Sequence, residues 1–119
     1  MPIENIKAKE DQGRLFDEAL SQKLNPNNKL YKLRDLINWD ELETKELSHI
    51  EIKQLGRNKK SNRVMLGLLV LQGMYNGSDH YIEAELMENM YWQYFCGYEY
   101  IQKRREVSEA TIRRFRNGI

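Results

Sequence analysis

The chain has 119 residues, of which 40% are hydrophobic and 31% are charged, and its net charge is +1. This composition is typical of one globular domain and excludes a disordered chain. A single cysteine excludes an internal disulfide, and with only two histidines beside it a structural zinc site is hard to build. The N-terminus lacks the apolar core of a signal peptide, and the longest apolar run, 64–71, is far shorter than the roughly 20 residues that span a bilayer. We expect a cytoplasmic protein without a membrane partner.

The N-terminal part of the chain predicts short helices behind a polar tail. Residues 1–12 show no apolar periodicity, so we expect a flexible tail followed by one helical domain over 13–119. Helical spacing of apolar residues predicts a first helix at 13–24. The Asn-Pro-Asn-Asn run at 25–28 ends it, because a residue before proline avoids the α region. Leucine spacing indicates a second short helix at 30–37.

A third helix and a long apolar helix come next. Asn38 or Asp40 is the expected N-cap of the third helix. The segment 63–75 is apolar on nearly every face, which predicts an enclosed central helix. Ser61 or Asn62 is expected to cap this central helix.

Glycines mark the segments around the middle of the chain. Gly67 and Gly73 would permit close approach of another helix to the central one. Asn76-Gly77 predicts a turn, with Gly77 as a left-handed C-cap, and Ser78 is expected to cap the helix that follows. A helix, a glycine turn and a second helix form a helix-turn-helix-like unit.

The segment 91–97 holds four aromatic rings, which are unfavourable to leave in water. It predicts a further short helix that stops at Gly97, with Tyr94 or Tyr98 as the rings left exposed. Ser108 is the expected N-cap of a last helix that runs to the C-terminus.

Together these patterns predict an all-α fold, a compact bundle of about six short helices that contains the helix-turn-helix-like unit. No segment alternates convincingly between apolar and polar residues, so strands are not expected. The expected core consists of Leu66, Leu69, Val70, Ile82, Leu86, Trp92, Phe95, Ile112 and Phe115.

The sequence shows no pattern of an independent active site. It contains no glycine-rich phosphate loop and no histidine in a recognisable nucleophile motif. Cys96 lies in an apolar aromatic segment, which predicts a buried, inert thiol. Glu83, Glu85 and Glu88 are expected to form a solvated helix face and not a metal site. No catalytic residue, metal ligand or cofactor is therefore expected in this chain.

Charge is distributed unevenly along the chain: residues 53–63 carry +5, residues 64–100 carry −5 and residues 101–119 carry +4. Basic side chains neutralise phosphates and release counterions, which gives sequence-independent affinity for nucleic acid. Basic runs are also common on ordinary surfaces, and composition alone leaves the two interpretations even. The candidate DNA-contacting residues are Arg57, Lys59, Lys60, Arg63, Lys103, Arg104, Arg105, Arg113, Arg114 and Arg116. We expect them on a common exterior surface; ion pairs with the acidic middle would count against the hypothesis.

Six stretches occur in a distinctive order. They are LRDLINWDELE at Leu33–Glu43, the loop at Gly56-Arg57, the apolar helix Arg63–Tyr75, NGSD at Asn76–Asp79, ENMYWQYFCG at Glu88–Gly97 and the segment Ser108–Arg116. From about residue 30 onward, this chain resembles the N-terminal domain of bacterial insertion-sequence transposases of the insertion-sequence-five type.

The resemblance implies a helical domain that binds DNA at the terminal inverted repeats of a mobile element. In that family the domain precedes a ribonuclease-H-like catalytic domain, whose acidic triad binds divalent metals. None of the acidic residues here matches the triad, so the catalytic domain and its metals are expected to be absent from this chain, which would not itself be an enzyme. The expected partners are the DNA ends of the element, and a second copy of the chain or full-length transposase.

Two alternatives remain open at this stage. The domain could be a protein-interaction or dimerisation module without DNA affinity, acting as a partner or inhibitor of a transposase. It could also be the remnant of a decayed element.

Overall fold

The computed structural model describes residues 18–47 and 59–118, with the backbone alone described at 46–47 and 59–61. This part of the chain contains no strand, which confirms the all-α prediction. Its seven helices are α2 (Leu20–Lys23), α3 (Lys29–Leu36), α4 (Trp39–Leu47), α5 (Lys59–Tyr75), α6 (Asp79–Glu88), α7 (Met90–Phe95) and α8 (Glu109–Gly118). The predicted tail at 1–12 lies outside the described residues.

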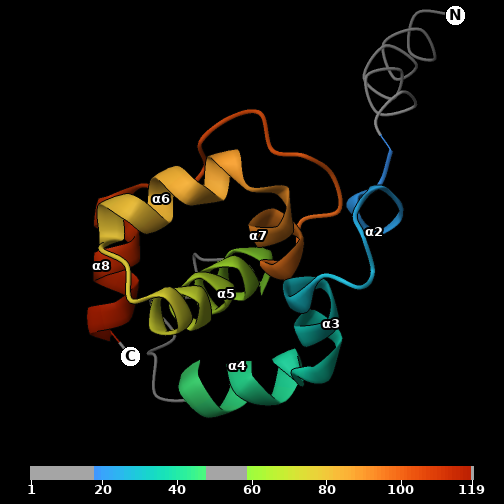
Figure 1. The fold of residues 1–119 in the computed structure, drawn as a ribbon. Helices are drawn as coiled ribbons and strands as arrows, with labels where there is room; N and C mark the ends of the chain where they lie inside the picture. Colours follow the sequence, from blue (N-terminus) through green and yellow to red (C-terminus); the bar gives the residue numbers. More distant parts are fainter. Residues whose placement is uncertain (1–17, 48–58, 119) are drawn as a thin grey trace, which may run out of the picture.

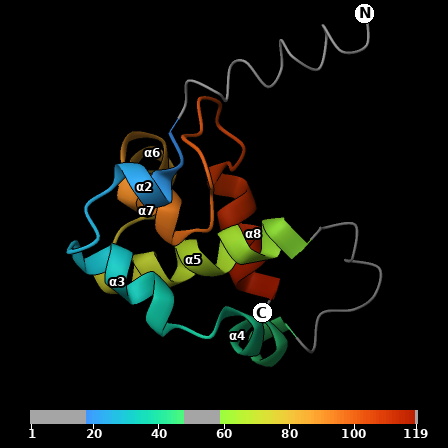
Figure 2. The ribbon, with the colours of Figure 1, turned by 90° about the vertical axis from the view of Figure 1, so that its right-hand side faces the viewer.

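Helix α5 lies at the centre of the bundle and packs against α4, α6 and α8, while α2 and α3 pack against α7 (Figure 1, Figure 2). Its apolar side chains are buried on several faces, as a helix without a polar stripe requires. Of the nine predicted core residues seven are buried, and Leu69 and Val70 are partly buried against them. The predicted caps Ser61 and Asn62 are wrong, because α5 begins at Lys59 and both residues lie inside its first turns.

Short polar side chains start the helices around α5. The Asn38 side chain accepts a hydrogen bond from the Glu41 amide at 3.1 Å, so Asn38 and not Asp40 caps α4. Ser78 and Ser108 cap α6 and α8 as predicted, each accepting a hydrogen bond at 3.1 Å from the amide three residues ahead. Asn89 ends α6 and caps α7, which fixes the sharp turn between the two helices.

The turn between α5 and α6 is built differently from the prediction. Asn76, and not Gly77, has the left-handed backbone conformation, with φ of 52°. A Cβ atom at Gly77 would lie 2.4 Å from the ring of Tyr81, so a larger residue there would displace this ring. Helix α7 ends at Phe95 with Cys96 as its C-cap, and the next residue, Gly97, has φ of 97°, so the predicted stop at this glycine is confirmed.

The aromatic segment packs more completely than the sequence indicates. Tyr94 and Tyr98 are only 5% and 2% exposed, so the prediction that one of these rings faces solvent is wrong. The Tyr94 ring stacks on Tyr31 of α3 at 4.6 Å between centroids. The Tyr98 hydroxyl donates to Glu106 at 3.0 Å, which satisfies its polar end inside the fold.

A buried glutamine ties the segment after α7 to the bundle. Gln93 is 1% exposed, and its Nε2 donates to the Leu86 carbonyl of α6 at 2.9 Å. Its Oε1 accepts from the Gln102 amide at 2.8 Å. Because both ends of the amide are paired, this polar side chain lies in the core without leaving an unsatisfied group. The connector that leads to α8 is thereby fixed near its middle.

Candidate nucleic-acid interface

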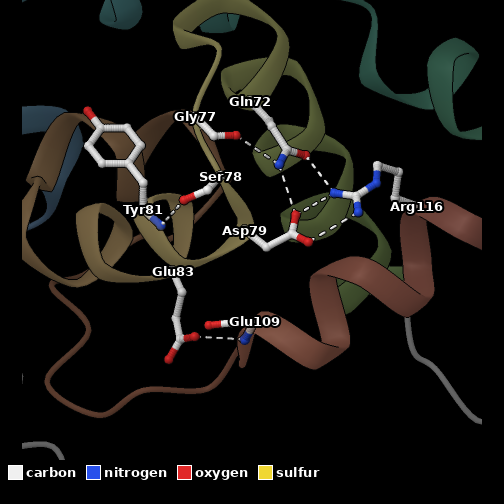
Figure 3. A network of polar contacts seen from close by, with 8 residues as sticks. All are labelled: Gln72, Gly77, Ser78, Asp79, Tyr81, Glu83, Glu109 and Arg116. Atoms are coloured by element: carbon white, nitrogen blue, oxygen red, sulfur yellow. Dashed lines mark hydrogen bonds and ion pairs between the residues drawn. The ribbon is translucent and has the colours of Figure 1, made fainter.

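Two carboxylates of α6 hold the two ends of α8. Asp79 and Glu83 are separated by four residues, so they lie on the same face of α6. Glu83 Oε2 accepts a hydrogen bond from the Glu109 amide, the first of α8, at 2.7 Å. Asp79 forms an ion pair with Arg116 near the other end of α8. Figure 3 shows both contacts on the side of α6 that faces α8. The last helix is thus anchored at both ends.

The contact at the C-terminal end of α8 is a network of three side chains (Figure 3). Arg116 uses two nitrogens for the two oxygens of Asp79, with Nη2 and Oδ2 3.1 Å apart. Gln72 of α5 donates to Asp79 Oδ1 at 2.9 Å, and its Oε1 accepts from Arg116 at 3.2 Å. The Arg116 hydrogen bond lowers the pKa of the Asp79 carboxyl, and the bond from Gln72 adds to this shift. The same contact raises the pKa of Arg116.

Glu83 contradicts the prediction that the acidic residues of α6 form a solvated face. It is 7% exposed and forms an ion pair with Arg105 in addition to its bond with the start of α8. A carboxylate beside the first amides of a helix is favourable, because those amides have no partner within the helix. Glu85 accepts a hydrogen bond from the Asn89 side chain at 3.2 Å, and Glu88 is exposed.

Helix α8 also carries exposed arginines. Ile112 and Phe115 are buried against the bundle, which leaves Arg113 and Arg114 exposed. Among the described residues, Arg113 has no hydrogen bond or ion pair, and Arg114 donates only to the carbonyl of Ala110 on its own helix, at 3.4 Å. Two guanidinium groups are therefore presented to solvent on a helix whose position is fixed by α6.

The connector before α8 adds exposed basic side chains. Lys103 and Arg104 are exposed, and Arg104 has no ion pair within the described part of the chain. Arg105 is exposed as well but is paired with Glu83. Of the predicted contacts in the C-terminal block, Arg105 and Arg116 therefore have carboxylate partners inside the molecule, and Arg104 and Arg113 have none. We call the set Arg104, Arg113 and Arg114 the outer arginines.

Arg63 points into the molecule. Its guanidinium lies 3.3 Å from the centre of the Trp39 ring, and Nη2 donates to the Phe95 carbonyl at 2.7 Å. Nη1 is buried without a hydrogen bond, and burial lowers the pKa of Arg63 to about 10. Arg34 of α3 donates to the neighbouring Tyr94 carbonyl at 3.0 Å. The two arginines bind the last carbonyls of α7, a structural role that the sequence analysis did not assign to either.

The side chains in the rest of the first basic block lie outside the described part of the structure. Arg57 lies outside the described residues, and the side chains of Lys59 and Lys60 are not described. A common exterior surface shared with the C-terminal block therefore stays a prediction for these residues.

The described residues give little support to a catalytic cysteine, a metal site or a membrane span. Cys96 is fully buried, and burial raises the pKa of its thiol to about 12, as expected for an inert cysteine. Residues 18–47 and 59–118 contain no group of three potential ligands able to hold a metal ion. No helix in this same part is long and apolar enough to cross a bilayer.

The sequence contains one signal for the anchored helix. Acidic residues four apart, Asp79 and Glu83, precede a C-terminal block whose arginines need partners. What the sequence could not indicate is that Gln72 of a different helix completes the Arg116 contact, because this depends on the turn between α5 and α6.

Comparison with known proteins gives one family and one curated relative. Residues 18–118 match the protein family described as "Transposase domain (DUF772)". The "Uncharacterized protein ORF8 in nfe locus" of Rhizobium meliloti is 30% identical over 105 residues, which cover 88% of this chain. The same match covers 50% of the relative, so this chain spans about half the length of that protein. No solved structure matches the chain.

Proposed function

Because this chain belongs to the transposase-domain family, we propose that it is the DNA-binding N-terminal portion of an insertion-sequence transposase. In this proposal it acts in the cytoplasm, where it recognises the terminal inverted repeats of its element. In this proposal, strand cleavage and transfer would be carried out by a catalytic portion with an acidic triad and divalent metals.

The observation that carries the proposal is the outward position of Arg113 and Arg114 on an anchored helix. A DNA-reading helix needs a buried stripe that attaches it to the domain and a polar, basic side that faces the duplex. Helix α8 has both, because Ile112 and Phe115 are buried while the two arginines are exposed. Fixing the helix before binding lowers the entropy that must be lost when the complex forms.

The proposed contacts divide into two groups. Arg104, in the connector, would bind phosphate, which contributes affinity and orientation but no sequence information. Arg113 and Arg114 would enter a groove, where arginine can bind the edge of guanine with two hydrogen bonds. Lys103 would help to attract the duplex over distance. Arg63 is excluded from the contacting set because its guanidinium lies between Trp39 and the end of α7.

A binding titration tests the proposal. The chain is titrated against a labelled duplex carrying the inverted repeat of its own element, and against a scrambled duplex, at about 50 and 200 mM salt. We expect binding at low salt that weakens steeply at the higher concentration, with preference for the inverted repeat. Arg113→Ala should weaken this binding. Its charge-matched control is Lys32→Ala, which removes one exposed basic residue of α3. Absence of binding to both duplexes at low salt would contradict the proposal.

A second candidate function is a protein-interaction module without DNA affinity. It is favoured by Leu36, which is 79% exposed at the end of α3, and by the part-exposed rings of Tyr75 and Tyr81. Exposed apolar side chains of this size are common at interfaces. Sedimentation of the chain with and without DNA separates the two functions, since only the module would self-associate or bind transposase while leaving DNA unbound.

A further inference from the structure

The Asp79 carboxylate pairs with the guanidinium of Arg116, which lies one helical turn from Arg113, one of the outer arginines. Asp79 is partly buried, with 15% of its side chain exposed, whereas the Arg116 side chain is 39% exposed, so the arginine is accessible from solvent at the pair. The charge of Asp79 also acts on Arg113, which contributes to the lowered pKa of the carboxyl.

A carboxylate and a phosphodiester compete for the same donors. Each presents two oxygens that accept parallel hydrogen bonds from a guanidinium, and the planar fork of arginine fits both. Arg116 directs two of its nitrogens to Asp79, and one of these also donates to Gln72. A phosphate could accept both hydrogen bonds from Arg116 only if Asp79 lost its own bonds to this guanidinium. The bound carboxylate therefore weakens the attraction between α8 and DNA.

We propose that Asp79 is an internal competitor of the DNA backbone, which holds Arg116 in the free domain and thereby limits affinity for DNA. This inference rests on the proposed function and adds a regulatory element to it. When DNA binds, Arg116 exchanges part of its contact with Asp79 for a phosphate oxygen, while Glu83 keeps the start of α8 in place. The domain then combines a firmly placed helix with a guanidinium that is released only by a strong anion.

The test compares two substitutions that each remove one negative charge from α6. Asp79→Asn keeps the shape of the side chain and an oxygen for Gln72, but it removes the charge that holds Arg116. Glu88→Gln makes the same change in charge at an exposed position of the same helix. Affinity for the inverted-repeat duplex is measured by fluorescence anisotropy at several salt concentrations, and far-UV circular dichroism checks the helix content of each variant.

We expect Asp79→Asn to bind DNA about fivefold more tightly than the wild type at about 50 mM salt, and its salt slope to steepen by about one unit. Glu88→Gln should change affinity less than about twofold, because its charge is exposed and screened. The same Asp79→Asn substitution is then made in an Arg116→Ala chain, where its effect should fall to that of Glu88→Gln.

Three results would overturn the inference. The first is an affinity of Asp79→Asn equal to that of Glu88→Gln. The second is an affinity below that of the wild type, as expected if Asp79 only positions α8. The third is a gain in affinity that persists in the Arg116→Ala chain. If the wild type binds DNA and loses affinity on Arg113→Ala while Asp79→Asn has no specific effect, only this inference fails. If neither the wild type nor Asp79→Asn binds either duplex, the proposed function fails with it.

Discussion

The Glu83 carboxylate accepts a hydrogen bond from the backbone amide of Glu109 at 2.7 Å, so α6 provides a cap for the first turn of α8. Most helices are capped by a residue of their own sequence, and here Ser108 does this for the Thr111 amide. The amide of Glu109 would remain without a partner, and Glu83 supplies one from a different helix. The position of the basic helix thus depends on an acidic residue 26 positions earlier in the chain.

Glu83→Ala should therefore destabilise the domain by about 2 kcal/mol, because it leaves a helix amide and Arg105 without their partner. Glu83→Gln keeps an acceptor and should lower the free energy of unfolding by only about 1 kcal/mol. Urea unfolding followed by circular dichroism measures both values. Glu88→Ala, at an exposed position on the same helix, serves as control and should stay within about 0.5 kcal/mol of the wild type. Equal stability of Glu83→Ala and this control would contradict the capping role.

Stability should also depend on pH through Asp79. The Arg116 hydrogen bond lowers the pKa of this carboxyl below its ordinary value of 3.8, so the folded state favours the ionised form. The resulting stabilisation is fully present above the unfolded-state pKa and is lost as the pH falls through the lower folded-state pKa. The difference in unfolding free energy between wild type and Asp79→Asn should thus be constant near neutral pH and shrink below about pH 4. Urea unfolding at stepped pH measures it; a difference that stays unchanged in acid would rule out the ion pair as its source.

The two glycines of α5 should respond in opposite directions to alanine. A Cβ at Gly67 would lie 2.9 Å from the Cα of Cys96, a backbone atom that cannot move aside easily, so Gly67→Ala should destabilise by about 1–3 kcal/mol. Gly73 has open space around its Cβ position, and Gly73→Ala should stabilise the helix by up to about 1 kcal/mol. Thermal unfolding of both variants tests the pair. A tolerated alanine at Gly67 would show that α5 and α7 do not pack this closely.

Gln93 should be one of the least replaceable polar residues. Gln93→Leu fills nearly the same volume but leaves the Gln102 amide and the Leu86 carbonyl without partners, which should cost about 2–3 kcal/mol. The measurement is again the free energy of unfolding in urea, compared with Gln22→Leu at an exposed site of α2. A change no larger than that of the exposed control would mean that water replaces both bonds.

The fold was largely predictable because local signals and burial agree. Ser78, Asn89 and Gly97 mark helix ends by their own chemistry, and the apolar run of α5 defines the centre of the core. Tyr94 and Tyr98 were predicted wrongly because their burial depends on partners from other segments, Tyr31 and Glu106. Helical periodicity shows which face of a helix is the more apolar, but it does not show which rings another element will cover.

The candidate site was predictable as a set of charges but not as a geometry. Counting basic residues could not separate Arg113, which is exposed, from Arg116, which is paired with Asp79. It also placed Arg63 among the DNA contacts, whereas its guanidinium stacks on Trp39. Ion pairs between residues far apart in sequence depend on how the helices pack, and the composition of the chain does not predict this packing.

The salt dependence of DNA binding by the wild type and by Arg113→Ala tests the central claim most directly. Fluorescence anisotropy with the inverted-repeat duplex from about 50 to 200 mM salt gives the slope of log affinity against log salt. The account predicts that Arg113→Ala weakens binding and reduces the slope by about one unit, while Lys32→Ala leaves both nearly unchanged. A wild-type chain that does not bind at low salt, or an Arg113→Ala chain with wild-type affinity and slope, would contradict the claim that α8 presents its outer arginines to DNA.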